Sequence, residues 1–224
     1  MTILNPLIEI LKTILVFFHD HVYPNYGIDI ILLTIVVRIA MIPLTLTQIK
    51  SQAQIQKIQP QINKIRQEYK DDKEKMNIET MKMYRENKIN PLSGCLPLLL
   101  QLPILFALFM LLQNYAPINE ESFLWLNKLG QPDPYFILVI IFVITSFLTQ
   151  QMMVTDQSQK ALGYIMPIAM GFIFYKFAAA LFIYFDTSNI WQLGERYIIS
   201  RFFVPKKSKE TKPIRSKKGK KKDD

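Results

Sequence analysis

Cysteine and histidine are scarce in this chain of 224 residues, and their scarcity excludes several kinds of site. The single cysteine, Cys95, rules out a disulfide framework or a thiolate metal site within one chain. The two histidines, His19 and His21, lie near the N-terminus, where we expect an interfacial position rather than metal ligation. The sequence has no glycine-rich phosphate loop, and its apolar runs contain neither a carboxylate pair nor a Ser/His constellation. We therefore predict that the protein is not an enzyme and that it has no catalytic residue, metal or cofactor.

Long apolar runs are abundant instead. Half of the residues are apolar, and they gather in runs separated by short polar segments, which is typical of multi-spanning membrane proteins. We expect an all-α multi-spanning membrane protein whose core, residues 23–200, is a bundle of five transmembrane helices. The spans are expected at about 27–46, 92–114, 135–153, 161–176 and 180–199.

Residues 1–22 predict a further helix beside this core. Apolar residues recur there at helical spacing, and Asn5-Pro6 is a typical helix start. Because Glu9, Lys12 and Asp20 interrupt the apolar residues, we interpret the segment as an extracytoplasmic amphipathic helix that lies in the membrane interface. A very short additional span is the alternative.

Basic residues are distributed unevenly along the chain. Residues 47–90 hold ten Lys and Arg, residues 115–134 hold one, and the chain from residue 195 onward holds twelve. Cytoplasmic segments of membrane proteins carry the excess of Lys and Arg. This rule places residues 47–90 and the C-terminus in the cytoplasm, and residues 1–26 and 115–134 outside. Five spans are consistent with that assignment.

Residues 49–90 predict a cytoplasmic helical hairpin. Its first helix carries a seam of apolar residues with alternating spacings of three and four, namely Ile55, Ile58, Ile62, Ile65 and Tyr69. Asp71-Asp72 predicts the turn, and Asn90-Pro91 ends the second helix. The apolar residues expected on the second helix are Ile78, Met81, Met83 and Tyr84. We expect Pro60 to kink the first helix, and the hairpin to be mobile because few of its contacts are buried.

Residues 201–224 form a basic tail that we expect to be disordered. Such a tail can bind ribosomal RNA phosphates by counterion release, or the headgroups of anionic lipids. The alternative is that it only fixes the topology. The lysines expected to make the contact are Lys206, Lys207, Lys217, Lys218, Lys220, Lys221 and Lys222.

A cation, Arg38, lies in the middle of the first expected span. A charge at that depth costs roughly 2.5–3.5 kcal/mol, so we expect it to face a polar pathway, with a satisfied ion pair as the simpler alternative. Thr34 lies four residues away and shares its helix face. Other polar residues in the expected spans are Gln101, Gln150, Gln151, Asp186, Ser188 and Asn189. We expect a water-filled groove on which such residues converge with Arg38.

Three stretches resemble the YidC/Oxa/Alb family of membrane protein insertases. They are LLTIVVRIAMIPLT (32–45), NPLSGCLPLLLQLPILFALF (90–109) and LFIYFDTSNIWQ (181–192). The second stretch is the most specific, and the resemblance covers about residues 5–200. It implies that Arg38 is the groove arginine, with Thr34 as its neighbour and Tyr184 as an aromatic that contacts substrate. It also implies that the hairpin receives substrate and that the tail contacts the ribosome.

Two features depart from the family pattern. Ala178-Ala179-Ala180 stand where many members have a Pro-Ser-Gly turn, and Asp186 stands where most members are expected to be apolar. Counted along their spans, Arg38 and Asp186 differ in depth by only about 9 Å across a bilayer core of about 30 Å. We therefore expect a weak or water-mediated contact between Arg38 and Asp186.

The function expected from these features is that of an insertase. It would receive nascent hydrophobic segments in a groove open to cytoplasm and lipid and release them into the bilayer, as a monomer, alone or beside the Sec translocon. The second possibility is an assembly chaperone for membrane complexes without insertion activity. A small-solute channel is the third, although the sequence shows no inverted repeat of the transporter kind. We expect a bacterial plasma membrane, with the thylakoid membrane as the alternative.

Overall fold

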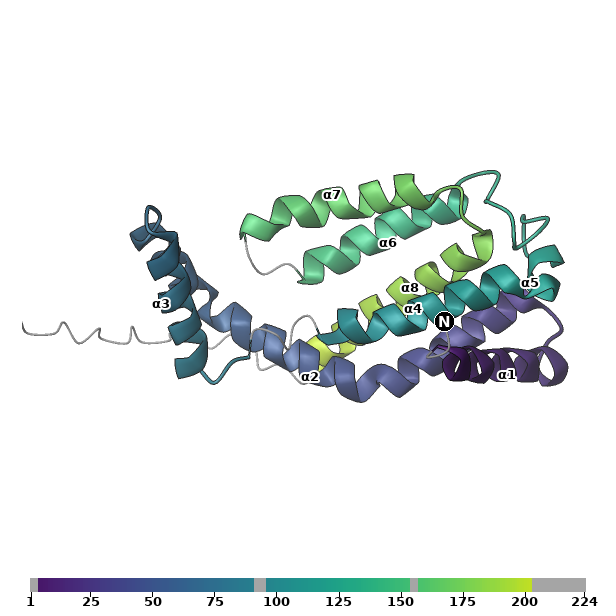
Figure 1. The fold of residues 1–224 in the computed structure, drawn as a ribbon, viewed down its shortest axis with the longest axis horizontal. Helices are drawn as coiled ribbons and strands as arrows, with labels where there is room; N and C mark the ends of the chain where they lie inside the picture. The colour runs from purple at the N-terminus through teal and green to yellow at the C-terminus, as the bar shows by residue number, and fades with distance from the viewer. Residues whose placement is uncertain (1–3, 91–95, 154–156, 203–224) are drawn as a thin grey trace, which may run out of the picture.

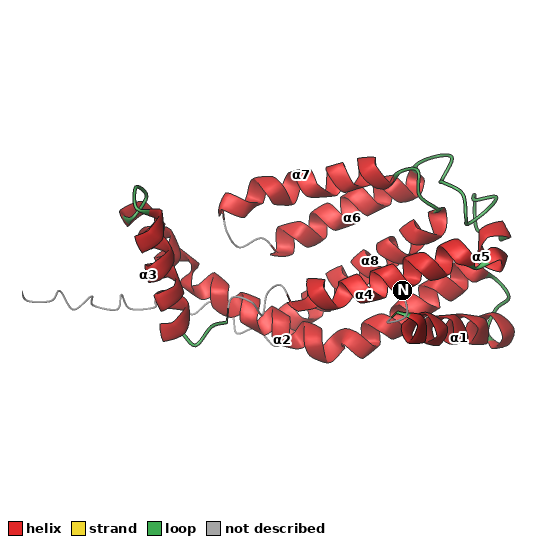
Figure 2. Ribbon diagram, in the orientation of Figure 1, coloured by secondary structure: helices red, strands yellow, loops and turns green. Residues whose placement is uncertain are grey.

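The computed structural model describes residues 4–90, 96–153 and 157–202, which form helices joined by loops (Figure 1). The helices are α1 (Asn5–His21), α2 (Tyr26–Glu68), α3 (Lys73–Glu86), α4 (Leu96–Asn114), α5 (Ala116–Glu120), α6 (Ile137–Met153), α7 (Gln157–Phe174) and α8 (Ala179–Phe202). Figure 2 shows the same arrangement coloured by secondary structure, with helices predominating throughout the described ranges. The expected all-α fold is confirmed, and a separate helix covers most of each of the five expected spans; residues 92–95 of the second span lie outside the described residues.

Helix α2 joins the first expected span to the hairpin without a break. The Asn25 side chain caps its start by accepting hydrogen bonds from the backbone N–H groups of Gly27 (3.0 Å) and Ile28 (3.4 Å). The helix is 43 residues long and contains Pro43 and Pro60. At 1.5 Å per residue it measures roughly 65 Å, about twice the hydrocarbon thickness of a bilayer. The expectation of a separate hairpin helix starting at residue 49 is therefore wrong.

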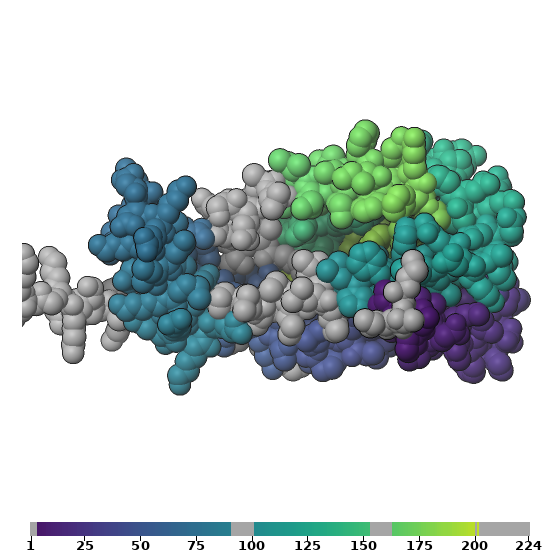
Figure 3. All heavy atoms as spheres, in the orientation of Figure 1, coloured from purple at the N-terminus to yellow at the C-terminus, as the bar shows by residue number. Residues whose placement is uncertain are grey.

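Helices α1, α4 and α8 pack on α2, and α6 and α7 form further layers beyond α8. Helix α8 contacts both α2 and α6, and α7 packs on the far side of α6. Helix α4 contacts α1, α2 and α8. The second half of α2 leaves this bundle and pairs with α3, so the hairpin projects from one end of the molecule (Figure 3). The bundle therefore has one end that carries the hairpin and an opposite end formed by the loops around α5.

Helix α1 packs on α2 and α4, with Leu11 and Leu15 buried in the shared core. A polar contact adds to this packing, because His19 Nδ1 lies 2.9 Å from an oxygen of the fully buried Asp29 carboxylate. The His19 ring also stacks on Tyr26, with 4.0 Å between the ring centroids. Apolar packing and a side-chain contact thus fix α1 to the start of α2. Its predicted position in the membrane interface stays a prediction.

The loop between α5 and α6 closes the end of the bundle opposite the hairpin. Asp133, which is buried, accepts hydrogen bonds from the Trp125 indole (3.1 Å) and from the backbone N–H of Leu138 at the start of α6 (2.8 Å). The same loop caps α8, because the carbonyls of Gln131 and Leu129 accept the N–H groups of Ala179 and Ala180. The alanines that depart from the family pattern therefore begin α8 in tight contact with this loop.

The hairpin has a small core of its own. Ile58, Ile62 and Ile89 are buried together, and Ile55, Met83 and Tyr84 pack against them. The seam predicted on the first helix is present at Ile58 and Ile62. Of the residues expected on the second helix, Ile78 and Met81 are exposed instead, because the face of α3 that meets α2 carries Met83 and Tyr84. Ile89, which follows α3, completes the core.

The described helices have the composition and surface of a membrane protein. By length and composition α2 can cross a membrane, and the shorter apolar segments Gln101–Asn114, Ile137–Met152 and Gly163–Phe174 accompany it. Large apolar side chains recur at helical spacing on the exposed faces of α6 and α7, namely Ile140, Ile144, Leu148, Ile165, Ile168, Phe172 and Ile173. A contiguous apolar surface of this kind is typical of contact with lipid.

Candidate functional site

A polar stripe runs along one face of α2. Thr34, Arg38, Thr45, Gln48 and Gln52 follow one another at spacings of four, seven, three and four residues, which keeps them on one side of the helix. Thr34, Thr45 and Gln48 are buried. The threonine hydroxyls donate to their own helix, Thr34 to the Ile30 carbonyl at 2.6 Å and Thr45 to the Met41 carbonyl at 3.2 Å. This arrangement satisfies the hydroxyls and leaves the longer side chains to face α8.

Helix α8 presents a matching stripe. Tyr184, Ser188, Trp191 and Glu195 are spaced by four, three and four residues, and Tyr184, Ser188 and Glu195 are buried. A third helix contributes Gln101, whose amide donates a short hydrogen bond to the Tyr184 hydroxyl. We call these two stripes together with Gln101 the polar seam between α2 and α8.

Arg38 lies at the centre of the polar seam. Its guanidinium interacts electrostatically with the Tyr184 hydroxyl and with the Glu195 carboxylate. Helices α2 and α8 both run from the α5 end of the bundle toward the hairpin end (Figure 1), so Tyr184 lies nearer the α5 end than Glu195, and Arg38 interacts with both. The structure thus brings together four predicted site residues: Thr34, Arg38, Gln101 and Tyr184.

A second arginine occupies the hairpin end of the seam. Arg196 is 5% exposed, and its guanidinium donates a hydrogen bond of 2.9 Å to the Gln52 side chain on α2 and a longer one of 3.5 Å to the Met152 carbonyl on α6. Arg196 also interacts electrostatically with Glu195. Two guanidinium groups therefore flank a single carboxylate, which leaves the seam with a net positive charge.

Sequence reasoning missed Thr45, Gln48, Gln52, Glu195 and Arg196. The available signal was the helical spacing that continues from Thr34 and Arg38 past residue 46, where the first span was expected to end. Because α2 does not stop there, the same face continues to Gln52.

The expected contact between Arg38 and Asp186 is wrong. Asp186 follows Tyr184 by two residues and so points about 200° away from it around α8. The Asp186 carboxylate is buried, and within the described chain neither oxygen has a hydrogen-bond partner.

Asn189 also lies away from Arg38. Its amide donates to the hydroxyls of Thr145 (3.2 Å) and Ser146 (2.8 Å) on α6. It therefore stabilises the packing of α6 on α8 from within the bundle. The predicted lysines of the tail, from Lys206 to Lys222, lie outside the described residues.

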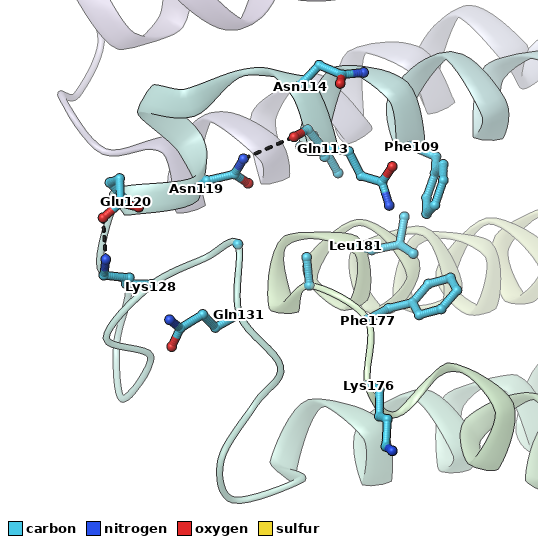
Figure 4. Close-up of a pocket in the computed structure, with 13 residues that line it drawn as sticks. Phe109, Gln113, Asn114, Asn119, Glu120, Lys128, Gln131, Lys176, Phe177 and Leu181 are labelled. Carbon is cyan, nitrogen blue, oxygen red and sulfur yellow. Dashed lines mark hydrogen bonds and ion pairs between the residues drawn. The ribbon is translucent and has the colours of Figure 1, made fainter.

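A cavity of about 520 Å³ opens at the α5 end of the bundle (Figure 4). It lies between α4, α5 and the turn before α8, with Phe109, Phe177 and Leu181 on its apolar side. Lys128 and Glu120 form an ion pair at its rim. Arg38 does not line it, so this cavity is separate from the polar seam.

The fold and the polar seam define a class: an all-α membrane protein that holds a net positive charge between apolar helices. A family model described as "60Kd inner membrane protein" matches residues 17–207. The chain belongs to this family, whose curated relatives carry the name membrane protein insertase YidC.

Two of these relatives match over most of their length. The YidC insertase of Fusobacterium nucleatum is 44% identical over 184 residues, covering 81% of this chain and 89% of the relative. That of Caldanaerobacter subterraneus is 40% identical over 191 residues, covering 85% and 92%.

A solved structure titled "Active YidC insertase crystal structure with the first transmembrane domain resolved" is also similar. It superposes with a TM-score of 0.71 at 30% identity, over 88% of this chain and 46% of that chain. This chain therefore spans just under half the length of that solved protein.

Proposed function

We propose that the protein is a membrane protein insertase that receives hydrophobic segments of nascent membrane proteins along the polar seam between α2 and α8. The observation that carries the proposal is Arg38, which interacts with Tyr184 and Glu195 inside an otherwise apolar bundle. An arginine at that depth is costly unless it serves a polar pathway. The family membership and the insertase names of the relatives support the same function.

The mechanism needs no catalytic chemistry. An entering segment gains roughly 25 cal/mol per Å² of apolar surface when it leaves water for lipid. The obstacle is its polar flank, which must cross the hydrocarbon. Polar groups along the seam, from Gln52 at the hairpin end to Thr34 and Tyr184, shorten that apolar path, and Arg38 attracts acidic residues of the flank.

We propose that the protein lies in the bacterial inner membrane with its N-terminus outside and its C-terminus in the cytoplasm. The family description names the inner membrane. The excess of Lys and Arg in residues 47–90 and after residue 195 supports the orientation. In this orientation the hairpin of α2 and α3 projects toward the cytoplasm, where a nascent chain arrives. The basic tail is then placed to bind a ribosome or anionic lipid, and the Sec translocon is a candidate partner.

Reconstitution tests the proposal. The purified protein is placed in liposomes and given a single-span substrate with an acidic flank, and insertion is scored by protease protection of that flank. We expect insertion by the wild type and by Arg38→Lys, and about tenfold less by Arg38→Ala, equivalent to about 1.4 kcal/mol. Insertion no better than in protein-free liposomes would exclude an independent insertase and favour the assembly chaperone. Full activity of Arg38→Ala would show that the charge at this position is dispensable.

A further inference from the structure

Glu195 is the acidic residue of the polar seam, and its carboxylate is buried without hydrogen bonds among the described residues. The residue as a whole is 9% exposed. Its polar neighbours are Thr45 on α2 and Trp191 one turn earlier on α8. A buried carboxylate that lacks hydrogen bonds is strongly unfavourable unless opposite charges compensate it. The charges that do so here are Arg38 and Arg196.

The two arginines are held differently. Arg196 donates hydrogen bonds to Gln52 and to the Met152 carbonyl, so its guanidinium is fixed between α2 and α6. Arg38 interacts electrostatically with Glu195 and Tyr184. It makes no hydrogen bond to Glu195, because neither Glu195 oxygen has a hydrogen-bond partner within the described chain. Arg38 is therefore the more easily released of the two cations.

We propose that Glu195 is the internal counter-ion of Arg38 and sets the preference of the seam for acidic segments. In the empty protein Glu195 and Arg38 attract each other across the seam. The carboxylate of an entering segment takes the place of Glu195 beside Arg38, while Arg196 continues to neutralise Glu195. Glu195 thus acts as a competitor that an acidic flank must displace, and it determines selectivity without contacting the segment.

This inference rests on the proposed insertase function, and it predicts an effect that depends on substrate charge. Two single-span substrates are compared in the liposome assay, identical except for Asp or Asn at one position of the translocated flank. In Glu195→Gln we expect the half-saturating concentration of the Asp substrate to fall about tenfold, because a competing charge has been removed. The value for the Asn substrate should stay unchanged.

Three further variants separate this role from a structural one. Glu195→Asp keeps the charge and should restore wild-type discrimination between the two substrates. Asp186→Asn removes another buried carboxylate from α8, on the face that points away from Arg38, and should leave discrimination unchanged. In Arg38→Ala the two substrates should insert equally, and adding Glu195→Gln should have no further effect.

The outcomes distinguish this inference from the proposed function. If the wild type inserts neither substrate, the insertase proposal itself fails. If the wild type inserts both, but Glu195→Gln changes the two substrates equally or not at all, only the counter-ion role is overturned. An effect of Glu195→Gln that persists in Arg38→Ala would also overturn it, since the residue would then act independently of Arg38.

Discussion

Arg38 is tolerated because its charge interacts with two polar neighbours on α8. These are Tyr184 and Glu195, which belong to one buried face of α8. Neither neighbour is a direct ion-pair partner with ideal geometry. An arginine held in this way retains hydrogen-bonding capacity for an incoming carboxylate, which a saturated ion pair would not.

A contrast between two glycines tests how tightly α2 is packed at its start. A Cβ atom at Gly27 would collide with the side chain of Phe123 in the loop after α5, whereas a Cβ at Gly194 of α8 meets nothing within 4 Å. We expect Gly27→Ala to destabilise the protein by about 1–3 kcal/mol through overpacking. Gly194→Ala should be neutral or stabilising by up to about 1 kcal/mol, because alanine favours a helix.

Denaturant unfolding in detergent micelles measures both effects. An equal response of the two variants would contradict the close approach of Phe123 to α2.

Among the described helices, α2 is the longest, at 43 residues, and it connects the two ends of the molecule. It begins beside the loop that closes the α5 end, carries the polar stripe past α8, and ends as half of the hairpin. Pro43 and Pro60 lie inside it and are the ordinary cause of bends in a helix. The hairpin and the face that carries Arg38 therefore belong to one continuous helix.

The hairpin is expected to depend on its small core. Ile62 is fully buried between α2 and α3, and Ile62→Ala should cost the pairing about 2–4 kcal/mol. Ile78 on the outer face of α3 is 58% exposed, so Ile78→Ala should change stability by less than about 0.5 kcal/mol.

Hydrogen exchange of the α3 backbone amides reports the difference. Protection of these amides should fall in Ile62→Ala and stay at the wild-type level in Ile78→Ala. If protection in Ile62→Ala stays at the wild-type level too, α3 does not depend on this contact.

The elements were largely predictable from the sequence because apolar runs of spanning length are a strong signal. Their ends were less so. Hydropathy predicts that the first span ends near residue 46, but the polar residues beyond it continue the same helix to Glu68. The site was predictable only in part: Thr34, Arg38, Gln101 and Tyr184 do come together, but Asp186 does not join them. The sequence gives the depth of Arg38 and Asp186 along their helices. Whether they meet depends on their angles around the helices, and therefore on how α8 is rotated against α2.

At the scale of the described molecule, large apolar side chains lie on the outside and charged side chains lie in the interior. The outward faces of α6 and α7 expose large apolar side chains, while the interior between α2 and α8 holds two arginines and a glutamate. A water-soluble protein has the reverse arrangement. The end with α5 is closed by a loop whose carbonyls cap α8, and the hairpin extends from the other end. The bundle therefore combines polar groups in its interior with apolar surface on α6 and α7.

Photo-crosslinking from two neighbouring positions of α8 tests most directly whether the seam receives the segment. A photoreactive phenylalanine replaces either Trp191, which lies on the polar seam, or Ile190, which is 57% exposed on another face of α8. A ribosome-bound nascent chain with one hydrophobic segment is then offered to each variant in membranes. We expect crosslinks to the nascent chain from position 191, several times stronger than from position 190. Equal yields, or a stronger signal from position 190, would contradict reception of the segment along the polar seam between α2 and α8.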